Sequence, residues 1–168
     1  MKIPGFLTDV AVNAAGSILG GITFSLIFFV WSDYIFKQPD LNGRWFFTIT
    51  YEKTSHSNFQ NLQVIYEVIL IQDGLHLTGT GEKVEEIHKD GTKLEYEGES
   101  RIPIAIAGTI DYNYLSHNNL NLHYKESGHE RESASFHRLT IFDTLRMSGA
   151  WESTIANSSG TVSWRRYK

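Results

Sequence analysis

The chain of 168 residues contains no cysteine, which excludes disulfide bridges, thiolate zinc sites and a cysteine nucleophile. A surplus of positive charge is also missing, since 15 Lys and Arg stand against 19 Asp and Glu and give a net charge of −4. Affinity for nucleic acid comes mainly from neutralising phosphates, so an acidic chain is a poor candidate for binding a DNA or RNA polymer.

Charge is missing altogether from one long segment near the N-terminus. No residue from Val10 to Ser32 is charged, and Asp9 and Asp33 bracket the run. About 20 apolar residues suffice to cross a bilayer core of about 30 Å. A signal peptide would begin with basic residues and end at a small-residue cleavage site, whereas this run ends in Phe-Phe-Val-Trp-Ser. We therefore expect a retained transmembrane helix over about residues 10–32, within an N-terminal segment 1–37.

Small and weakly polar residues recur at every fourth position of this segment and favour close approach of two helices in lipid. The predicted oligomerisation residues, which include a GxxxG pair, are Asn13, Gly16, Ser17, Gly20, Gly21 and Ser25. Such residues are also common in membrane helices that do not associate, so both interpretations stay open. Lys2 precedes the apolar segment and Lys37 follows it, so positive charge flanks both ends and does not fix the orientation of the helix in the membrane.

Residues 38–168 are predicted to form a single soluble domain, which begins after Pro39 and a turn-like Asp-Leu-Asn-Gly. Apolar residues then alternate with period two, as in Trp45, Phe47 and Ile49. The expected strands cover residues 44–51, 62–72, 75–79, 94–96, 102–114, 120–124, 134–138, 145–151 and 162–166. Short strands joined by hairpins predict an all-β sandwich or barrel. An antiparallel, up-and-down barrel of about eight strands is favoured because closure removes exposed edge strands.

Signals for catalysis are weak, and we expect no enzyme activity, no catalytic residue, no metal and no cofactor. No P-loop, GxSxG or Rossmann motif occurs. Four histidines in the second half lack metal-site spacing and are expected on the surface: His117, His123, His129 and His137. The acidic residues Glu82, Glu85 and Glu86 are expected in a solvated turn.

Arginines interleaved with aromatic residues in the second half could build a pocket for an anionic, planar ligand. Arg138 and Arg166 share the parity of Phe136 and Trp164, so both are expected to point inward unless they are ordinary exposed partners of Glu. The predicted ligand-binding residues are Tyr51, Tyr66, Tyr112, Arg138, Trp151, Trp164 and Arg166. Glycines within the strand patterns either curve the barrel or make space for a ligand: Gly79, Gly81, Gly98, Gly108 and Gly149.

The layout resembles a known family. A membrane segment, a short linker and a barrel that opens with Leu41-Asn42-Gly43-Arg44-Trp45 and continues through the hairpin LIQDGLHLTGTG, residues 70–81, are similar to the transmembrane β-barrel effectors of CBASS antiphage operons. The resemblance implies a lipocalin-like receptor for a cyclic dinucleotide on the cytoplasmic side of the bacterial inner membrane. Ligand binding in that family promotes homo-oligomerisation, and the membrane segments then disrupt the inner membrane, causing growth arrest or cell death.

The family also implies functional pairing with an enzyme that makes the nucleotide second messenger. This sequence has one convincing membrane helix where the common version of the family has two. Three alternatives stay open. The first is an effector of the related Panoptes branch, which its cyclic nucleotide holds inactive. The second is a membrane-tethered lipocalin-like carrier of an apolar ligand, and the third is an interaction module with a packed core.

Overall fold

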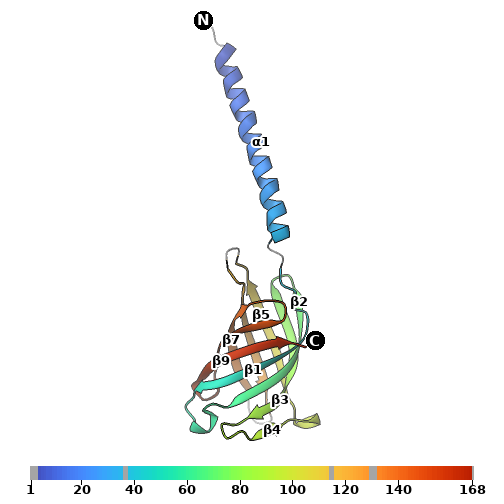
Figure 1. The fold of residues 1–168 in the computed structure, drawn as a ribbon, viewed down its shortest axis with the longest axis vertical. Coiled ribbons are helices and arrows are strands. Elements are labelled where there is room, and N and C mark those ends of the chain that lie inside the picture. Colours follow the sequence, from blue (N-terminus) through green and yellow to red (C-terminus); the bar gives the residue numbers. More distant parts are fainter. Residues whose placement is uncertain (1–3, 36–37, 114–115, 129–131, 168) are drawn as a thin grey trace. The chain divides into compact units, whose positions relative to one another are not determined.

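The computed structural model describes residues 4–35, 38–113, 116–128 and 132–167. The chain divides into two compact units, Met1–Gln38 and Pro39–Lys168. Figure 1 shows the helix of the first unit and the strands of the second.

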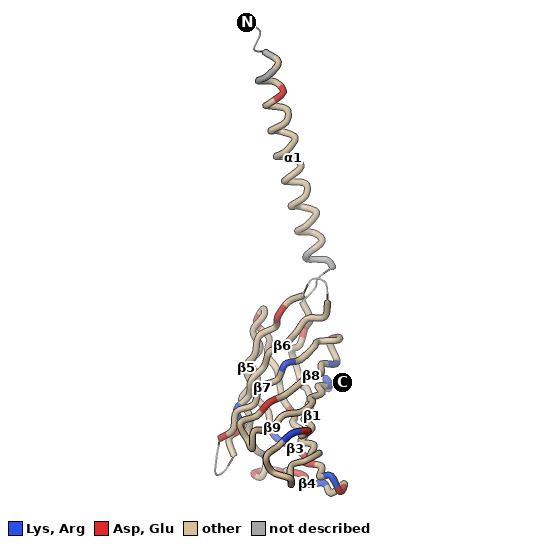
Figure 2. The backbone as a smooth tube through the Cα atoms, turned by 90° about the vertical axis from the view of Figure 1, so that its left-hand side faces the viewer, with Lys and Arg blue, Asp and Glu red and all other residues tan. Residues whose placement is uncertain are grey.

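The first unit is the helix α1 (Pro4–Ile35). Its segment Thr8–Trp31 is 24 residues long and apolar, and about 36 Å of helix at 1.5 Å per residue is enough to span a bilayer core of about 30 Å. Large apolar side chains such as Leu19, Phe24 and Leu26 are exposed along it. Figure 2 shows how little charge the described helix carries compared with the strands. The structure thus contains one N-terminal helix with the length and composition of a membrane span.

The described residues of the second unit form nine strands, which arise from the alternation of apolar and polar residues. In chain order they are β1 (Gly43–Lys53), β2 (Gln63–Asp73), β3 (His76–Ile87), β4 (Lys93–Glu95), β5 (Ile102–Asp111), β6 (Asn119–Ser127), β7 (Glu132–Ile141), β8 (Arg146–Ser153) and β9 (Ser158–Arg166). Where the connections are described, they contain the short 3-10 helices η1 (Ser57–Phe59), η2 (Gly98–Ser100) and η3 (Ile155–Asn157).

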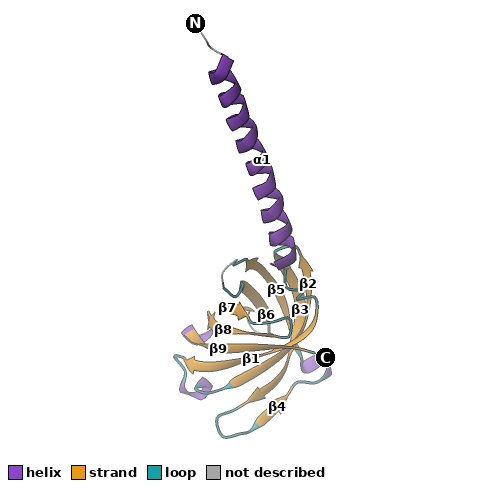
Figure 3. Cartoon of the chain, turned by 45° about the horizontal axis from the view of Figure 1, so that its top comes forward, coloured by secondary structure: helices purple, strands orange, loops and turns teal. Residues whose placement is uncertain are grey.

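The strands close into an antiparallel barrel. They pair in the order β2-β1-β9-β8-β7-β6-β5-β3, and β2 also pairs with β3, so eight strands form the closed wall. The short strand β4 extends the sheet beside β3 (Figure 3). The predicted all-β barrel with one N-terminal helix is therefore confirmed.

Aromatic side chains fill much of the barrel interior. Along β1 the residues Trp45, Phe47 and Ile49 are buried, as period-two alternation requires. The ring of Phe47 stacks between Tyr66, at 4.6 Å, and Trp164, at 4.4 Å between ring centroids. Such stacked rings add specific contacts to the hydrophobic burial. The interior is a packed core over this part of the barrel.

The glycines within the strands allow neighbouring strands to approach closely. A Cβ atom on Gly149 would lie 1.9 Å from the carbonyl oxygen of Arg138, and one on Gly79 would lie 2.5 Å from that of Ile69. Gly81 and Gly108 are equally crowded. Of the two roles expected for these glycines, the geometry therefore favours tight strand packing over space for a ligand. Gly98 lies in η2, outside the strands.

Candidate ligand site at the far end of the barrel

The two ends of the barrel are built differently. The linker end is where β1 begins, next to Leu41, and the far end is where β1 stops at Lys53. At the linker end the indole nitrogen of Trp45 donates to the Leu41 carbonyl at 2.9 Å, and the Leu41 backbone nitrogen donates to Gln72 Oε1 at 2.8 Å. Leu41 and Trp45 are both fully buried, so this end is closed by apolar side chains.

Arg166 completes the closure of the linker end. Its guanidinium donates to the carbonyl oxygens of Asp40 at 3.1 Å and Thr144 at 3.3 Å, and also to that of Asn42. The same group lies 5.9 Å above the ring of Trp45 and 3.7 Å from the Asp40 carboxylate. Its side chain is 23% exposed. Arg166 therefore lies over the end of the core, where backbone oxygens already occupy its donors.

The expected inward orientation of Arg138 is wrong. Its side chain is 61% exposed and pairs on the outer wall with Glu152 at 2.8 Å. Along β7 the buried residues are Ser133, Ser135, His137 and Leu139, so Phe136 and Arg138 share the outer face. The sequence contained the deciding signal, because Leu139 and Ile141 have the parity of His137.

The remaining predicted ligand-binding residues separate into two groups. Tyr51, Tyr66, Trp151 and Trp164 are buried in the barrel, where Tyr51 meets Trp151 edge-on at 4.6 Å between ring centroids. Tyr112 follows the last residue of β5 at the opposite, linker end. The structure thus brings together four aromatic residues of the predicted set, and it places Tyr112, Arg138 and Arg166 elsewhere.

Ionisable side chains gather inside the far end, and of these only Tyr66 belongs to the predicted ligand-binding set. The Tyr66 hydroxyl donates to Glu126 Oε2 at 2.6 Å. Lys83 forms an ion pair with Glu86, and the two side chains are only 11% and 14% exposed. The Lys83 ammonium also lies 4.9 Å from the ring centroid of Tyr96. We call Tyr66, Lys83, Glu86, Tyr96 and Glu126 the far-end cluster.

A β-bulge places Lys83 and Glu86 on the same face. Ile65 pairs with Glu85 but Tyr66 pairs with Lys83, so β3 carries one extra residue at this point. The extra residue lets positions 83 and 86 both face inward, which strict alternation forbids. The expectation that Glu82, Glu85 and Glu86 lie in a solvated turn is therefore wrong, since all three belong to β3.

Burial and neighbouring groups shift the pKa values of Tyr66 and Lys83. Burial raises the pKa of Tyr66 well above its usual value, and Tyr124 and Glu126 raise it further. Burial alone would lower the pKa of Lys83, but its hydrogen bond to Glu86 and the charge of that carboxylate outweigh burial and raise it. The far-end cluster therefore offers a neutral hydroxyl donor and a charged ammonium at neutral pH.

His137 lies deeper in the barrel, so the expected surface position is wrong for this histidine. Its ring is fully buried, and the indole nitrogen of Trp164 donates to its Nδ1 at 3.4 Å. Its Nε2 has no hydrogen-bond partner among the described residues. Burial lowers the pKa of His137 to about 3, so the ring is neutral. In the tautomer that this bond requires, Nε2 carries the proton and is a buried donor.

A groove opens beside Glu86 at the rim of the far end. It is lined by Asn58, Phe59, Leu62, Glu86, His88, Lys89 and Asp90. Phe59 packs against Tyr51 at 5.9 Å between ring centroids, which connects the groove to the barrel interior. Its carboxylates can accept from amino groups, Lys89 can bind phosphate oxygens, and Phe59 offers a ring for stacking.

Among the described residues, no group of three or more His, Asp or Glu could hold a metal ion. His129, one of the four histidines considered above, lies outside the described residues. Comparisons with models of protein families, with curated proteins and with solved structures gave no significant match.

Proposed function

We propose that this protein is a membrane-anchored receptor whose barrel binds a cyclic dinucleotide at the far end, in the manner of the antiphage effectors it resembles. The observation that carries the proposal is the far-end cluster, where Lys83, Glu86 and Glu126 face inward beside aromatic rings. An interior that served packing alone would hold apolar residues there.

The ion pair between Lys83 and Glu86 is suited to exchange with such a ligand. A buried charge is costly when its partner is removed without replacement. A nucleotide replaces both partners, because a phosphate oxygen can take the place of Glu86 beside Lys83, and a base amino group can take the place of Lys83 beside Glu86. Lys89 and Phe59 at the rim add a second cation and a stacking surface.

We further propose that α1 spans the bacterial inner membrane once and leaves the barrel in the cytoplasm. Ligand binding would then control homo-oligomerisation, through the helix residues Asn13, Gly16, Ser17, Gly20, Gly21 and Ser25, and disruption of the membrane. A Cβ atom on Gly16, Gly20 or Gly21 would meet nothing within 4 Å, so that face is open to a neighbouring helix. A ligand that activates the protein must bind the oligomer more tightly than the unassembled chain. A ligand that holds it inactive, as in the Panoptes branch, must have the opposite preference.

The test is a thermal-shift measurement on the full chain in detergent with a panel of cyclic dinucleotides, using linear dinucleotides as ligand controls. A ligand that binds only the folded state raises the melting temperature with its concentration. The double variant Lys83→Gln/Glu86→Gln removes both charges together, so no unpaired charge is left buried, and it should abolish the shift. The matched control Arg138→Ala, on the outer wall, should retain it.

Each result decides a separate part of the proposal. Absence of a shift with every cyclic dinucleotide would refute nucleotide sensing. An equal shift in the double variant and the unmodified protein would refute the far-end site.

The buried aromatic residues favour a second candidate, a tethered carrier of an apolar ligand. Trp151 and Trp164 line the interior with Tyr124. A shift with long-chain fatty acids, combined with none from nucleotides, would support the carrier and contradict the receptor.

A further inference from the structure

The outer wall formed by β2, β3 and β5 carries two rows of uncharged residues. Ile69 pairs with Thr80, which pairs with Ala105, and the next row holds Ile71, Thr78 and Ala107. Ile69 is 56% exposed and Ile71 is 62% exposed. Two isoleucines exposed to this degree on one strand face, beside small residues, form a weakly polar surface.

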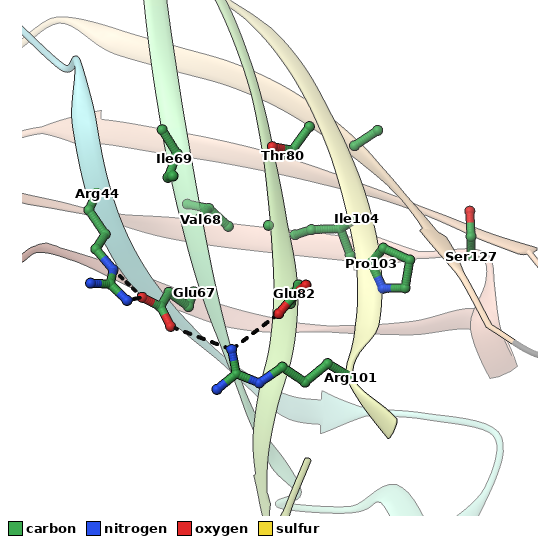
Figure 4. Close-up of a pocket in the computed structure, with 12 residues that line it drawn as sticks. Arg44, Glu67, Val68, Ile69, Thr80, Glu82, Arg101, Pro103, Ile104 and Ser127 are labelled. Carbon is green, nitrogen blue, oxygen red and sulfur yellow. Dashed lines mark hydrogen bonds and ion pairs between the residues drawn. The ribbon is translucent and has the colours of Figure 1, made fainter. Parts of the chain in front are cut away.

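A strip of four charged side chains borders these rows towards the far end (Figure 4). Glu67 pairs with Arg44 of β1 on one side, and the guanidinium of Arg101 lies between Glu67, at 4.0 Å, and Glu82, at 3.1 Å. Because the guanidinium of Arg101 lies between the two carboxylates, the charged groups follow the order positive, negative, positive, negative. We call Arg44, Glu67, Arg101 and Glu82 the charge strip.

The strip is held in place before any partner binds. Glu67 and Glu82 are directly opposite each other on β2 and β3, an arrangement of like charges that destabilises a sheet unless a cation bridges it. Arg101 supplies that cation, and its Nε donates to the Tyr96 carbonyl at 3.1 Å. Arg101 therefore has a fixed position between the carboxylates. The groove that includes the strip is also lined by Ile69, Thr80 and Ala105 of the first uncharged row.

We propose that this wall is a contact surface for a second copy of the chain. A two-fold axis that lies in the contact plane, runs along the strands and passes between Glu67 and Arg101 reverses the order of the strip in the second copy. Arg44 then faces Glu82 of the partner subunit, and Glu67 faces Arg101 of the partner subunit. All four contacts join opposite charges, so the strip is complementary to itself, as an isologous interface requires.

The same axis brings the uncharged rows together. Ile69 faces Thr80 of the partner subunit, and Ile71 faces Thr78 of the partner subunit. Because the axis runs along the strands, the linker ends of both barrels lie on the same side of the dimer. Two copies anchored in one membrane need that arrangement. The contact involves the outer wall alone, so it does not depend on nucleotide binding at the far end.

The decisive experiment reverses every charge of the strip at once. The variant Arg44→Glu/Glu67→Arg/Glu82→Arg/Arg101→Glu keeps each ion pair within the chain but inverts its sign. It should associate with itself, since its reversed strip is again complementary. Mixed with the unmodified chain, however, it places like charges opposite each other across the interface, which opposes association.

Association at the wall is measured by disulfide cross-linking through one introduced cysteine. The chain has no cysteine of its own, so Thr80→Cys, beside the axis, supplies the only thiol. Full-length protein in liposomes, carrying two distinguishable tags, is exposed to a mild oxidant. Homodimers should cross-link in the unmodified and the reversed backgrounds. The amount of cross-linked mixed dimer should be roughly tenfold lower than random pairing of the two chains predicts, because like charges face each other across its interface. Ser163→Cys, on the outer face of β9, is the matched control and should not cross-link.

Mixed dimers at the statistical share would overturn the proposal, because the strip would then have no part in the contact. Equal cross-linking from positions 80 and 163 would overturn it as well, since association through the helix alone predicts that result. If the reversed variant fails to fold, the comparison of Thr80→Cys with Ser163→Cys still decides the matter. Absence of cross-linking from both positions would also contradict the proposal, because a second copy on this wall should bring the two introduced thiols at position 80 together.

Discussion

The two ends of the barrel hold their charged side chains by different means. At the linker end, backbone carbonyl oxygens accept from Arg166, and these oxygens are fixed by the chain itself. At the far end, Lys83 and Glu86 hold each other through flexible side chains. A ligand can replace a side-chain partner, because that side chain can rotate away, whereas the carbonyl oxygens of Asp40 and Thr144 can move only with the backbone. The comparison indicates that the linker end provides stability and the far end provides exchangeable contacts.

Removing the core of the linker end should have the largest effect. Trp45 is fully buried, so Trp45→Ala should lower the free energy of unfolding by about 3–5 kcal/mol, as large-to-small core substitutions do. Chemical denaturation of the full chain in detergent, followed by circular dichroism, measures this loss. Phe136→Ala is the control, because Phe136 is 39% exposed and its removal should cost far less. Equal losses would contradict a stabilising role for the linker end.

Removing the arginine that covers this core should have the next largest effect. Arg166→Ala removes hydrogen bonds from a charged group to carbonyl oxygens, and we expect a loss of about 2 kcal/mol in the free energy of unfolding. The outward Arg138→Ala should cost about 0.5 kcal/mol or less, since its pair with Glu152 is solvated. Thermal-shift responses to nucleotides should survive in both variants. Loss of that response in Arg166→Ala alone, with the fold intact, would move ligand binding to the linker end.

Between the two ends, His137 should make stability depend on pH. Its pKa is about 3 in the folded protein and 6.5 in the reference state, so the unfolded chain binds more protons between these values. Stability should therefore fall as the pH drops below about 6.5, by up to about 1.4 kcal/mol per pH unit. Denaturation of the unmodified protein and His137→Gln at pH 7.5 and pH about 5 measures the slope.

The variant His137→Gln should lose this component of the slope, because its amide does not titrate. The control His123→Gln changes an exposed histidine of β6 and should keep the slope of the unmodified protein. Identical slopes in all three proteins would show that His137 does not control the pH response.

The smallest effect is expected from the far end. Tyr66→Phe removes one hydroxyl bond to Glu126 and should lower the free energy of unfolding by about 1 kcal/mol. Tyr167→Phe, at a side chain 56% exposed near the linker end, is the control and should leave stability nearly unchanged. A loss at position 66 as large as that of Trp45→Ala would remove the contrast between the two ends.

The strands and the barrel could be predicted because alternation is a direct consequence of strand geometry. Trp45, Phe47 and Ile49 face inward as their spacing indicates. The prediction was wrong where a strand offers two plausible faces. In β7 the large residues Phe136 and Arg138 share one face of the strand. The buried face is the other one, which carries His137 and Leu139.

The candidate site depends on a feature that no local pattern announces. Lys83 and Glu86 face inward because β3 gains a residue opposite the step from Ile65 to Tyr66. A bulge of this kind follows from pairing with another strand, so a single-strand pattern does not contain it. The acidic residues around it look like a polar turn for the same reason. The four aromatic residues of the predicted set that lie in the interior were predictable, and the ionisable partners beside them were not.

The position of the tryptophans has an optical consequence. The chain has four tryptophans, and Trp45, Trp151 and Trp164 are all buried in the barrel. The indole of Trp164 is bonded to His137 and stacks on Phe47, which stacks in turn on Tyr66 of the far-end cluster. Protonation of His137 therefore alters the surroundings of the Trp164 ring directly. A ligand at the far-end cluster alters them through the contacts of Tyr66 with Phe47 and of Phe47 with Trp164. The barrel contains its own fluorescent reporter, and its emission can follow the far end in a membrane without any added label.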